Sequence, residues 1–390
     1  MADWPEGFIW GTATSAHQVE GGNSNSDWWA WEHAAGTPCR EHSGDACDHY
    51  HRYPEDIALL AELGFNAYRF SIEWARIEPE EGEFSKAQLE HYRRVLSCCH
   101  EHGITPVVTF HHFTSPRWVA ARGGWESSST PDRFARYCEH AAAHLGDLIA
   151  VACTINEPNI VAEMGYELGR FAPGVASGAA RERANHNFVL GHQRAREAIK
   201  SVVHDVPVGL TLAMRDYQPV DGGDDKLDSL RARSEDVFLA SVVGDDFIGV
   251  QTYSRERVGP QGLVDPEKGA ELTLMGYEFY PDSLQATIRR AIEVAGNMPV
   301  LVTENGIGTD DDSRRIAYVE QALQGVRSCI EDGIDVRGYI YWSALDNFEW
   351  ALGYEPTFGL IAVDRNTQKR TPKPSARWLG DIARRAEPPA

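Results

Sequence analysis

Two glutamates follow short apolar runs of the chain, and each stands beside an asparagine. Glu157 lies in the stretch AVACTINEPN (150–159), and Glu304 lies in VTENG (302–306). Pro158 has no backbone donor, so we expect a strand to stop there and to leave Glu157 where a loop begins. Two carboxyl groups at one site suit the cleavage of a glycosidic bond. One protonates the leaving oxygen, and the other attacks the anomeric carbon or activates water.

A single glutamate at a strand end is more often a solvated loop residue than a catalyst. Two such glutamates, with Arg69 and Tyr253 on neighbouring apolar segments, are much less easily explained by chance. The carboxyl groups would be about 5–5.5 Å apart in an enzyme that retains anomeric configuration, and about 6.5–9.5 Å apart in one that inverts it. Other run ends carry His111, His112, Phe113, Asn156, Gln251, Asn305 and Trp342, whereas the end at Met214-Arg215 offers no role that we can assign.

Eight short apolar runs, rich in β-branched and aromatic residues, predict buried parallel strands. They are residues 8–13, 66–72, 105–113, 149–156, 206–214, 246–254, 298–305 and 336–345. Longer segments with helical periodicity lie between them, for example 54–64, 86–103, 281–296 and 313–333. Five glycines near segment ends, at positions 64, 103, 146, 296 and 333, suit left-handed caps. Strands that alternate with helices indicate βαβ units.

Eight such units predict an α/β fold of the (β/α)8 TIM barrel type, and loops account for the length above about 250 residues. We expect a single domain over residues 1–390, because no Pro/Gly/Ser-rich linker divides the chain. A doubly wound open sheet is the rival, but it would usually carry a glycine-rich phosphate loop that this sequence lacks. In such barrels the active site lies at the carboxyl ends of the strands, where the acids fall.

Five motifs resemble one known family. They are GFIWGTATSAHQVEG (7–21), YRFSIEWARIEP (68–79), TINEP (154–158), VTENG (302–306) and YWSALDNFEWALGY (341–354). Their order is similar to that of the family 1 glycoside hydrolases, the β-glucosidase family, and the resemblance spans nearly the whole chain. It implies a (β/α)8 barrel and a retaining mechanism through a covalent glycosyl-enzyme.

The resemblance implies that Glu157 is the general acid/base and that Glu304 is the nucleophile. Glu304 must stay ionised, so we expect Arg69 and the Tyr253 hydroxyl to hold it. The pKa of Glu157 should be raised, because a like charge lies nearby and solvent is partly excluded. Once Glu304 is glycosylated its charge is gone, and Glu157 can then act as a base.

Sugar-binding residues follow from the same resemblance. Gln18, His112, Asn156, Glu349 and Trp350 match positions that bind the hydroxyls of the non-reducing sugar. Asn156, beside the acid, suits a contact to the 2-hydroxyl. Trp342 would lie under the apolar face of the ring. For Trp10 and Trp74 we expect core packing instead.

The sequence departs from the family in places that affect the pocket. Gln251-Thr252 stand where Asn-Tyr is usual, Phe113 replaces a common tryptophan, and Thr357 replaces a basic residue. The segment between Met214 and Asp246 is shorter than usual, which predicts a wider mouth. The retained Glu349-Trp350 pair suggests a neutral pyranose with a free 6-hydroxyl.

Composition limits partners and location. The net charge of −21 disfavours nucleic acid and anionic membranes as partners. We see no secretory signal and no membrane-spanning run, and the seven cysteines show no disulfide or zinc spacing, so a reducing cytoplasm is expected. The pairs around His49-His51 and His111-His112 do not have metal-site spacing, and Asp310-Asp312 suit a solvated loop before a helix. We expect no cofactor and no metal, and the sequence gives no oligomeric state.

Three functions remain open at this point. The first is a retaining exo-β-glycosidase acting on small β-glycosides or oligosaccharides, with glucosidase, galactosidase or fucosidase preference undecided. The second is a catalytically weak or non-catalytic sugar-binding relative. The third is a metal-dependent barrel hydrolase, which would need a ligand cluster at the strand ends.

Overall fold

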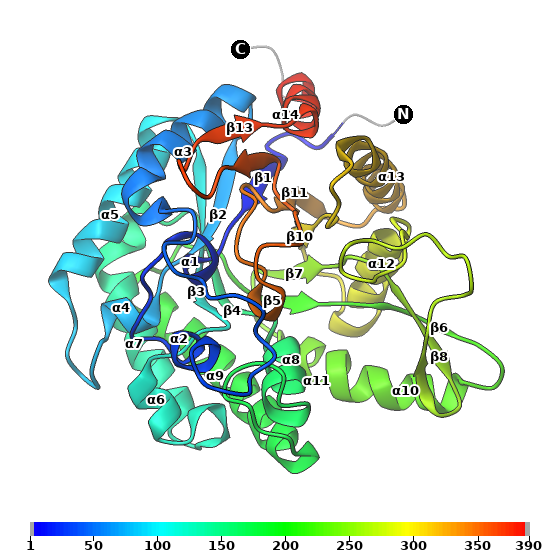
Figure 1. Cartoon of the computed structure of the whole chain (residues 1–390), viewed down its shortest axis with the longest axis horizontal. Coiled ribbons are helices and arrows are strands. Elements are labelled where there is room, and N and C mark those ends of the chain that lie inside the picture. The colour runs from blue at the N-terminus through cyan, green and yellow to red at the C-terminus, as the bar shows by residue number, and fades with distance from the viewer. Residues whose placement is uncertain (1–3, 387–390) are drawn as a thin grey trace.

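A computed structural model describes residues 4–386, and its centre is a closed barrel of eight parallel strands (Figure 1). Every predicted strand is present, within a few residues of its expected ends. The barrel strands are β1 (Ile9–Ala13), β2 (Ala67–Ser71), β3 (Thr105–His112), β4 (Val151–Asn156), β5 (Val208–Ala213), β7 (Phe247–Gln251), β10 (Val300–Asn305) and β11 (Val336–Trp342). Neighbours around the ring follow chain order, and β11 closes on β1 through the pairing of Ile9 with Gly338. The (β/α)8 fold class is therefore confirmed.

The strands are buried on both faces, which explains their near-continuous apolar character. All residues of β2, β5, β7 and β10 are buried. A cluster of buried side chains joins several barrel strands with Phe358 of the loop after β11. Its strand members are Ala13, Val107, Cys153, Phe247, Leu301, Ile340 and Trp342. The barrel interior is thus a packed core that supports the residues at the strand ends.

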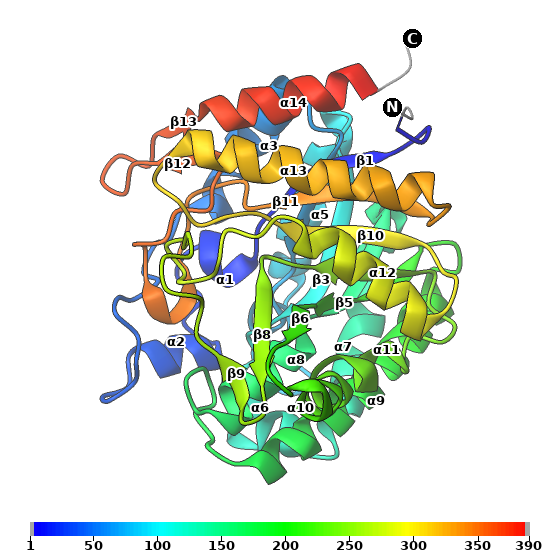
Figure 2. The ribbon, with the colours of Figure 1, turned by 90° about the vertical axis from the view of Figure 1, so that its right-hand side faces the viewer.

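Helices follow the strands and cover the outside of the barrel. The main ones are α3 (His49–Leu63), α5 (Lys86–Glu101), α7 (Thr130–Leu145), α9 (Gly178–Val202), α12 (Ser283–Ala295), α13 (Asp312–Glu331) and α14 (Pro374–Ala386). Figure 2 shows α12, α13 and α14 lying side by side. Four of the five predicted glycine caps have positive φ, but Gly146 has a φ of −63° and continues into a 3-10 turn, so that expectation was wrong.

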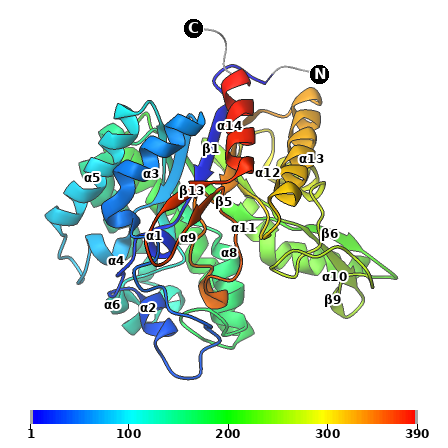
Figure 3. The ribbon, with the colours of Figure 1, turned by 45° about the horizontal axis from the view of Figure 1, so that its top comes forward.

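The unit after β5 is irregular. Its helical part consists of α10 (Asp224–Arg231), a π-helical turn (Ala232–Asp236) and α11 (Val237–Leu239). Beside α10 lies a separate small sheet of β6 (Asp216–Pro219), β8 (Arg255–Gly259) and β9 (Gly262–Val264). Figure 3 shows β6, β9 and α10 gathered on one side of the barrel. The connections after β5 and after β7 therefore combine into one outer wall.

A buried polar cluster joins the N-terminal part of the chain to its C-terminal part. His49 Nδ1 lies 2.7 Å from Asp56 Oδ2, and Arg370 donates to both oxygens of Asp56 at 2.7 and 2.9 Å. These contacts join α3 to the strand β13 (Arg370–Pro372), so the His49 segment has a structural role. Trp10 and Trp74 are buried in the core, as expected.

All seven cysteines are unpaired, and six of them are buried. Within residues 4–386, no helix is both long and apolar enough to cross a membrane. No three His, Cys, Asp or Glu side chains of the described part of the chain are grouped as metal ligands.

Candidate active site

A cavity of about 180 Å³ opens at the carboxyl ends of the strands. Glu157 and Glu304 both line it, although they are far apart in the sequence. Its walls also include His112, Trp342, Glu349 and Trp350, together with Tyr253 and Gln251. The structure therefore brings the two predicted acids to one place, which is the arrangement that glycosidic bond cleavage requires.

Glu304 is held by two side chains from other strands. It lies near the end of β10 and is 3% exposed. Arg69 Nη1 donates to Glu304 Oε1 at 2.5 Å, and the Tyr253 hydroxyl donates to Oε2 at 2.6 Å. Burial raises the pKa of Glu304, while the Arg69 charge and the hydrogen bonds from Tyr253 and Arg69 oppose that rise. These two contacts are the ones that the sequence predicted for a carboxylate that stays ionised.

Glu157 stands directly after β4 in a left-handed backbone conformation, with a φ of +44°. Such a conformation is uncommon for a residue with a Cβ, and it is concentrated at functional sites. Pro158 is the first residue of the short helix α8 (Pro158–Ile160), because proline fits the first helical position without a lost hydrogen bond. The expectation that the chain enters a loop at Pro158 was therefore wrong.

The Glu157 carboxyl has a different environment from that of Glu304. Among the described residues, it accepts one side-chain hydrogen bond, from Gln251 Nε2 at 3.0 Å. Burial raises the pKa of Glu157 well above its usual range, and the negative charge of Glu304 raises it further. Arg69 and Arg215 act in the opposite direction. Burial and the charge of Glu304 therefore favour the protonated form of Glu157.

Asn156 is fixed by partners on two sides. Arg69 Nη2 donates to Asn156 Oδ1 at 2.5 Å, and Asn156 Nδ2 lies 3.2 Å from His112 Nε2. Burial and the Arg69 charge lower the pKa of His112 well below its usual value, so its imidazole stays neutral and accepts this bond. One chain of contacts thus runs from His112 through Asn156 and Arg69 to Glu304.

Aromatic rings also line the cavity. The rings of His112 and Trp342 stack with their centroids 5.7 Å apart, and Trp350 stacks on His17 at 5.6 Å. Glu349 precedes Trp350 and also lines the cavity. Burial and the charge of Glu304 raise the pKa of Glu349 to about 8. The cavity thus combines flat apolar walls with a few polar groups, as sugar pockets do.

Gln18 lies behind this wall. It is fully buried, and its amide nitrogen donates to the Phe348 carbonyl at 2.8 Å and to Asn347 Oδ1 at 3.2 Å. Ser15 donates to its amide oxygen at 2.6 Å. Gln18 therefore contacts the loop that carries Glu349 and Trp350, and its own contact with a sugar stays a prediction.

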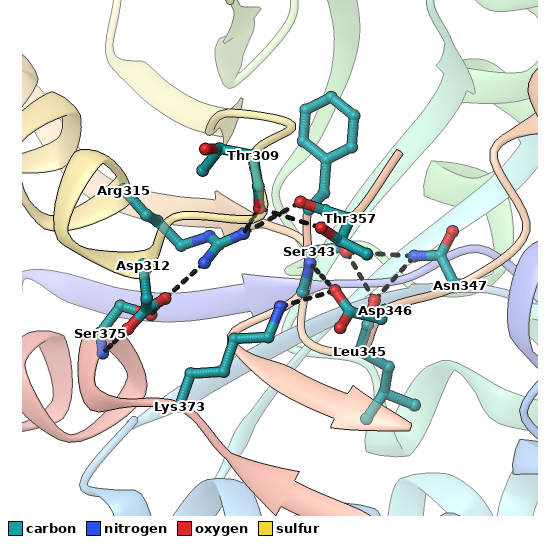
Figure 4. A network of polar contacts seen from close by, with 12 residues as sticks. Thr309, Asp312, Arg315, Ser343, Leu345, Asp346, Asn347, Thr357, Lys373 and Ser375 are labelled. Carbon is teal, nitrogen blue, oxygen red and sulfur yellow. Dashed lines mark hydrogen bonds and ion pairs between the residues drawn. The ribbon is translucent and has the colours of Figure 1, made fainter. Parts of the chain in front are cut away.

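The loop after β11 is anchored by charged residues of α13 and the C-terminal segment (Figure 4). Lys373 Nζ lies 2.8 Å from Asp346 Oδ1, and the Gly359 amide donates to the same oxygen at 2.8 Å. Arg315 donates to the Thr357 carbonyl at 2.9 Å. Both ends of the segment that carries Glu349 and Trp350 are therefore fixed.

The acidic run before α13 takes part in this anchoring. Asp311 caps the helix by accepting from the Ser313 amide at 2.9 Å. Asp312 forms an ion pair with Arg315 and accepts from the amide and the hydroxyl of Ser375 at 2.7 Å each. The prediction of a solvated loop was therefore wrong for Asp312, whose side chain is only 19% exposed.

Sequence reasoning missed the outer wall of the cavity. Arg215 follows β5, Arg255 and Glu256 begin β8, and Met275 and Tyr277 come from a turn before α12. Arg215 pairs with Glu163 at 3.1 Å, and Arg255 pairs with Glu278 at 2.7 Å. The position of Arg215 at a strand end was a usable signal, but nothing in the sequence marked the turn at 271–279 as part of the site. The wider mouth expected from the short 214–246 segment stays a prediction.

The chain is similar to known proteins of one family. The profile of the family described as glycosyl hydrolase family 1 matches residues 1–257 and 252–388. The chain is similar to the β-glucosidase A of Thermotoga maritima, with 32% identity over 435 residues and 98% of each chain covered. It is also similar to a bifunctional β-D-glucosidase/β-D-fucosidase of Bifidobacterium breve, with 34% identity and coverage of 96% of this chain and 97% of the relative. Among solved structures, the β-glycosidase BGL167 has a TM-score of 0.94 at 52% identity, with 99% of this chain and 98% of that chain covered.

Proposed function

The chain belongs to glycosyl hydrolase family 1 and is a retaining β-glycosidase of the β-glucosidase type, and we propose how its residues carry out that reaction. The substrate is a β-glycoside whose terminal non-reducing sugar enters the cavity. The proposal rests on one observation: two buried carboxyl groups share this cavity, and only one of them is paired with an arginine.

In the first step, Glu304 attacks the anomeric carbon while Glu157 donates its proton to the glycosidic oxygen. The bond from the anomeric carbon to that oxygen breaks, the alcohol leaves, and an ester bond to Glu304 forms. Arg69 and Tyr253 keep Glu304 ionised for the attack, because both favour its charged form.

In the second step, Glu157 takes a proton from water, and the water oxygen attacks the anomeric carbon. The ester bond to Glu304 breaks and restores its carboxylate, and the released sugar keeps its β-configuration. The ester carries no negative charge, so the repulsion that raises the pKa of Glu157 is absent at this stage. The same residue can therefore act first as an acid and then as a base.

Sugar recognition is proposed for the residues around Glu304. Trp342 would lie against the apolar ring face, and Asn156, His112, Gln18, Glu349 and Trp350 would bind the hydroxyl groups. Asn156 is the candidate for the 2-hydroxyl, since it directly precedes Glu157 in the chain and contacts Arg69 and His112. Glu349 suits a neutral pyranose with free 4- and 6-hydroxyls, because an anionic substituent there would face a carboxyl group.

Glucosides are the proposed preferred substrates, with tolerance for galactosides or fucosides. The fucosidase activity of the Bifidobacterium breve relative supports this tolerance. Oligosaccharides as well as small glycosides are proposed, and nucleic acid is not, given the net charge of −21. We also propose a cytoplasmic location, because seven unpaired cysteines suit a reducing compartment. We also propose that residues 1–390 form one domain.

The test uses aryl β-D-glucosides and two variants. Glu304→Gln should reduce kcat by at least about 10³-fold on every aryl glucoside, because the covalent step is lost. Glu157→Gln should spare the first step for a 2,4-dinitrophenyl glucoside, whose leaving group needs no proton, and should impair it for phenyl glucoside. Sugar binding without hydrolysis by the parent protein would instead support the non-catalytic alternative.

A further inference from the structure

Gln251 stands between the two acids but has no role in the reaction described so far. It is the last residue of β7 and is 1% exposed. In the barrel it pairs with Glu304 of β10 on one side and with Ala213 of β5 on the other. Its side chain lines the cavity, so it lies on the inner face together with Ala213.

The side chain reaches across one strand. Glu157 follows β4, and β5 lies between β4 and β7. Adjacent strands are about 4.8 Å apart, so the side chains of Gln251 and Glu157 together must bridge about two such spacings. The small side chain of Ala213 leaves this path open, and the amide nitrogen arrives 3.0 Å from Glu157 Oε1.

The amide is anchored at its other end. The hydroxyl of Thr303, next to Glu304 on β10, donates to Gln251 Oε1 at 3.2 Å. With its oxygen engaged by Thr303, the amide presents N–H donors to Glu157. The amide N–H can bond only to an oxygen that offers it a lone pair. Oε1 of Glu157 must therefore act as the acceptor, whether the carboxyl group is protonated or ionised.

We propose that Gln251 is a positioning residue that fixes which oxygen of Glu157 carries the catalytic proton. Oε1 is occupied by the amide, so the proton resides on Oε2, and Oε2 is the atom that faces the glycosidic oxygen. The inference deepens the proposed function and rests on Glu157 being the acid/base. It makes the Thr303–Gln251–Glu157 chain part of the machinery for proton transfer.

The same bond acts in both steps. In the first step it orients the protonated carboxyl, so that proton transfer starts from a defined geometry. In the second step it stabilises the carboxylate, because a hydrogen bond donated to a charged group is stronger than one donated to a neutral group. Loss of the bond should therefore raise the pKa of Glu157 and weaken its action as an acid.

Other charged or titratable groups also face Glu157, and they must stay constant in a test. They are His112 of β3, Arg69 and Glu304, Arg215 after β5, Tyr253 after β7, Arg255 and Glu256 of β8, and Tyr277 and Glu349 on the cavity wall. Substitution of Gln251 or Thr303 by an uncharged residue changes none of these charges. A shift of the alkaline limb then reports the bond from the amide to Glu157, and a shift of the acid limb reports the effect of the amide on Glu304, whose pKa it also lowers.

The test compares three variants of the whole protein. Gln251→Met keeps the length of the side chain and removes the amide. Thr303→Val removes the anchor and leaves the amide in place. Thr252→Val is the matched control: its hydroxyl lies 2.7 Å from that of Thr287 on α12, it is fully buried on the same strand segment, and it does not line the cavity.

Two substrates separate positioning from simple loss of structure. For phenyl β-D-glucoside, whose departure needs the proton, Gln251→Met should lower kcat/KM by about 10-fold, and the alkaline limb of its pH profile should move up by about one unit. For 2,4-dinitrophenyl β-D-glucoside, kcat/KM should change by less than about threefold, because little proton transfer is needed. Thr303→Val should show the same pattern with smaller effects, and Thr252→Val should leave both profiles unchanged.

Equal losses on both substrates with an unmoved alkaline limb would overturn the inference, because only a structural role would then remain. If Gln251→Met does not fold, the same measurements on Thr303→Val test the inference. If the parent protein hydrolyses neither substrate, the proposed function itself fails, and that result is distinct from a failure of the Gln251 assignment.

Discussion

Glu157 and Glu304 share one cavity but differ in the side chains that contact them. Glu304 receives an arginine and a tyrosine hydroxyl, and Glu157 receives one amide. Burial raises the pKa of both, and the negative charge of Glu304 raises the pKa of Glu157 further. The two roles in the proposed mechanism thus follow from environment, since the residue type is the same.

The first prediction at this scale concerns pH. Activity requires Glu304 ionised and Glu157 protonated, so kcat/KM should rise with pH through the pKa of Glu304 and fall with pH through that of Glu157. Tyr253→Phe removes a hydrogen bond that favours the charged form of Glu304, so the acid limb should move to higher pH while the alkaline limb stays in place. Measured pH profiles of kcat/KM on one aryl glucoside check this. Movement of the alkaline limb alone would contradict the assignment.

The barrel strands position the residues of the site, and the sequence predicted well which residues lie at the strand ends. Glu157, Glu304, Arg69 and Tyr253 come from four barrel strands or the residues just after them, because parallel strands bring their carboxyl ends to one rim. The reach of Gln251 across β5 could not be predicted, because it depends on the small size of Ala213 and on the register of β7. The turn at 271–279 does not lie at the end of a barrel strand. The alternation of strands and helices in the sequence therefore gave no sign that it belongs to the site.

The loop after β11 gives a prediction at the element scale. Lys373→Met should leave Asp346 without its cation and loosen the segment that carries Glu349 and Trp350. We expect KM for an aryl glucoside to rise by about 10-fold with a smaller change in kcat, and stability to fall by about 1–3 kcal/mol, because one partner of a mostly buried pair is removed. Steady-state kinetics and thermal unfolding measure the two effects.

A matched control is available on the surface. Arg337 and Asp335 form a pair whose side chains are 59% and 52% exposed, so Arg337→Met should change neither KM nor stability appreciably. If Lys373→Met behaved like Arg337→Met, the anchoring role of the C-terminal segment would be wrong.

The whole molecule depends on contacts between the beginning and the end of the chain. The barrel closes where β11 pairs with β1, and Arg370 of β13 bonds Asp56 of α3. Strand alternation predicted the closed barrel, because each unit of strand and helix can be recognised locally. The pairing of Asp56 with Arg370 spans more than three hundred residues. Local sequence patterns carry no information on such a contact.

Stability should report this contact in a pH-dependent way. Burial alone would raise the pKa of Asp56, but His49 and Arg370 together lower it below its usual value. A lowered carboxyl pKa contributes stability above the unfolded value of about 3.9, and that contribution is lost as pH falls through the folded value. Arg370→Met should therefore destabilise the protein by about 3 kcal/mol near neutral pH, with a smaller difference below about pH 4. Urea unfolding at several pH values measures it, and a difference independent of pH would contradict it.

In the proposed mechanism Glu304 forms a covalent bond to the sugar. The most direct measurement is incubation with 2-deoxy-2-fluoro-β-D-glucosyl fluoride, which slows release of the intermediate, followed by peptide mapping by mass spectrometry. We predict one fluoroglucosyl group per chain, on the peptide containing VTENG and at Glu304. A label on Glu157, or rapid turnover to a sugar of inverted configuration without any labelled peptide, would contradict the account.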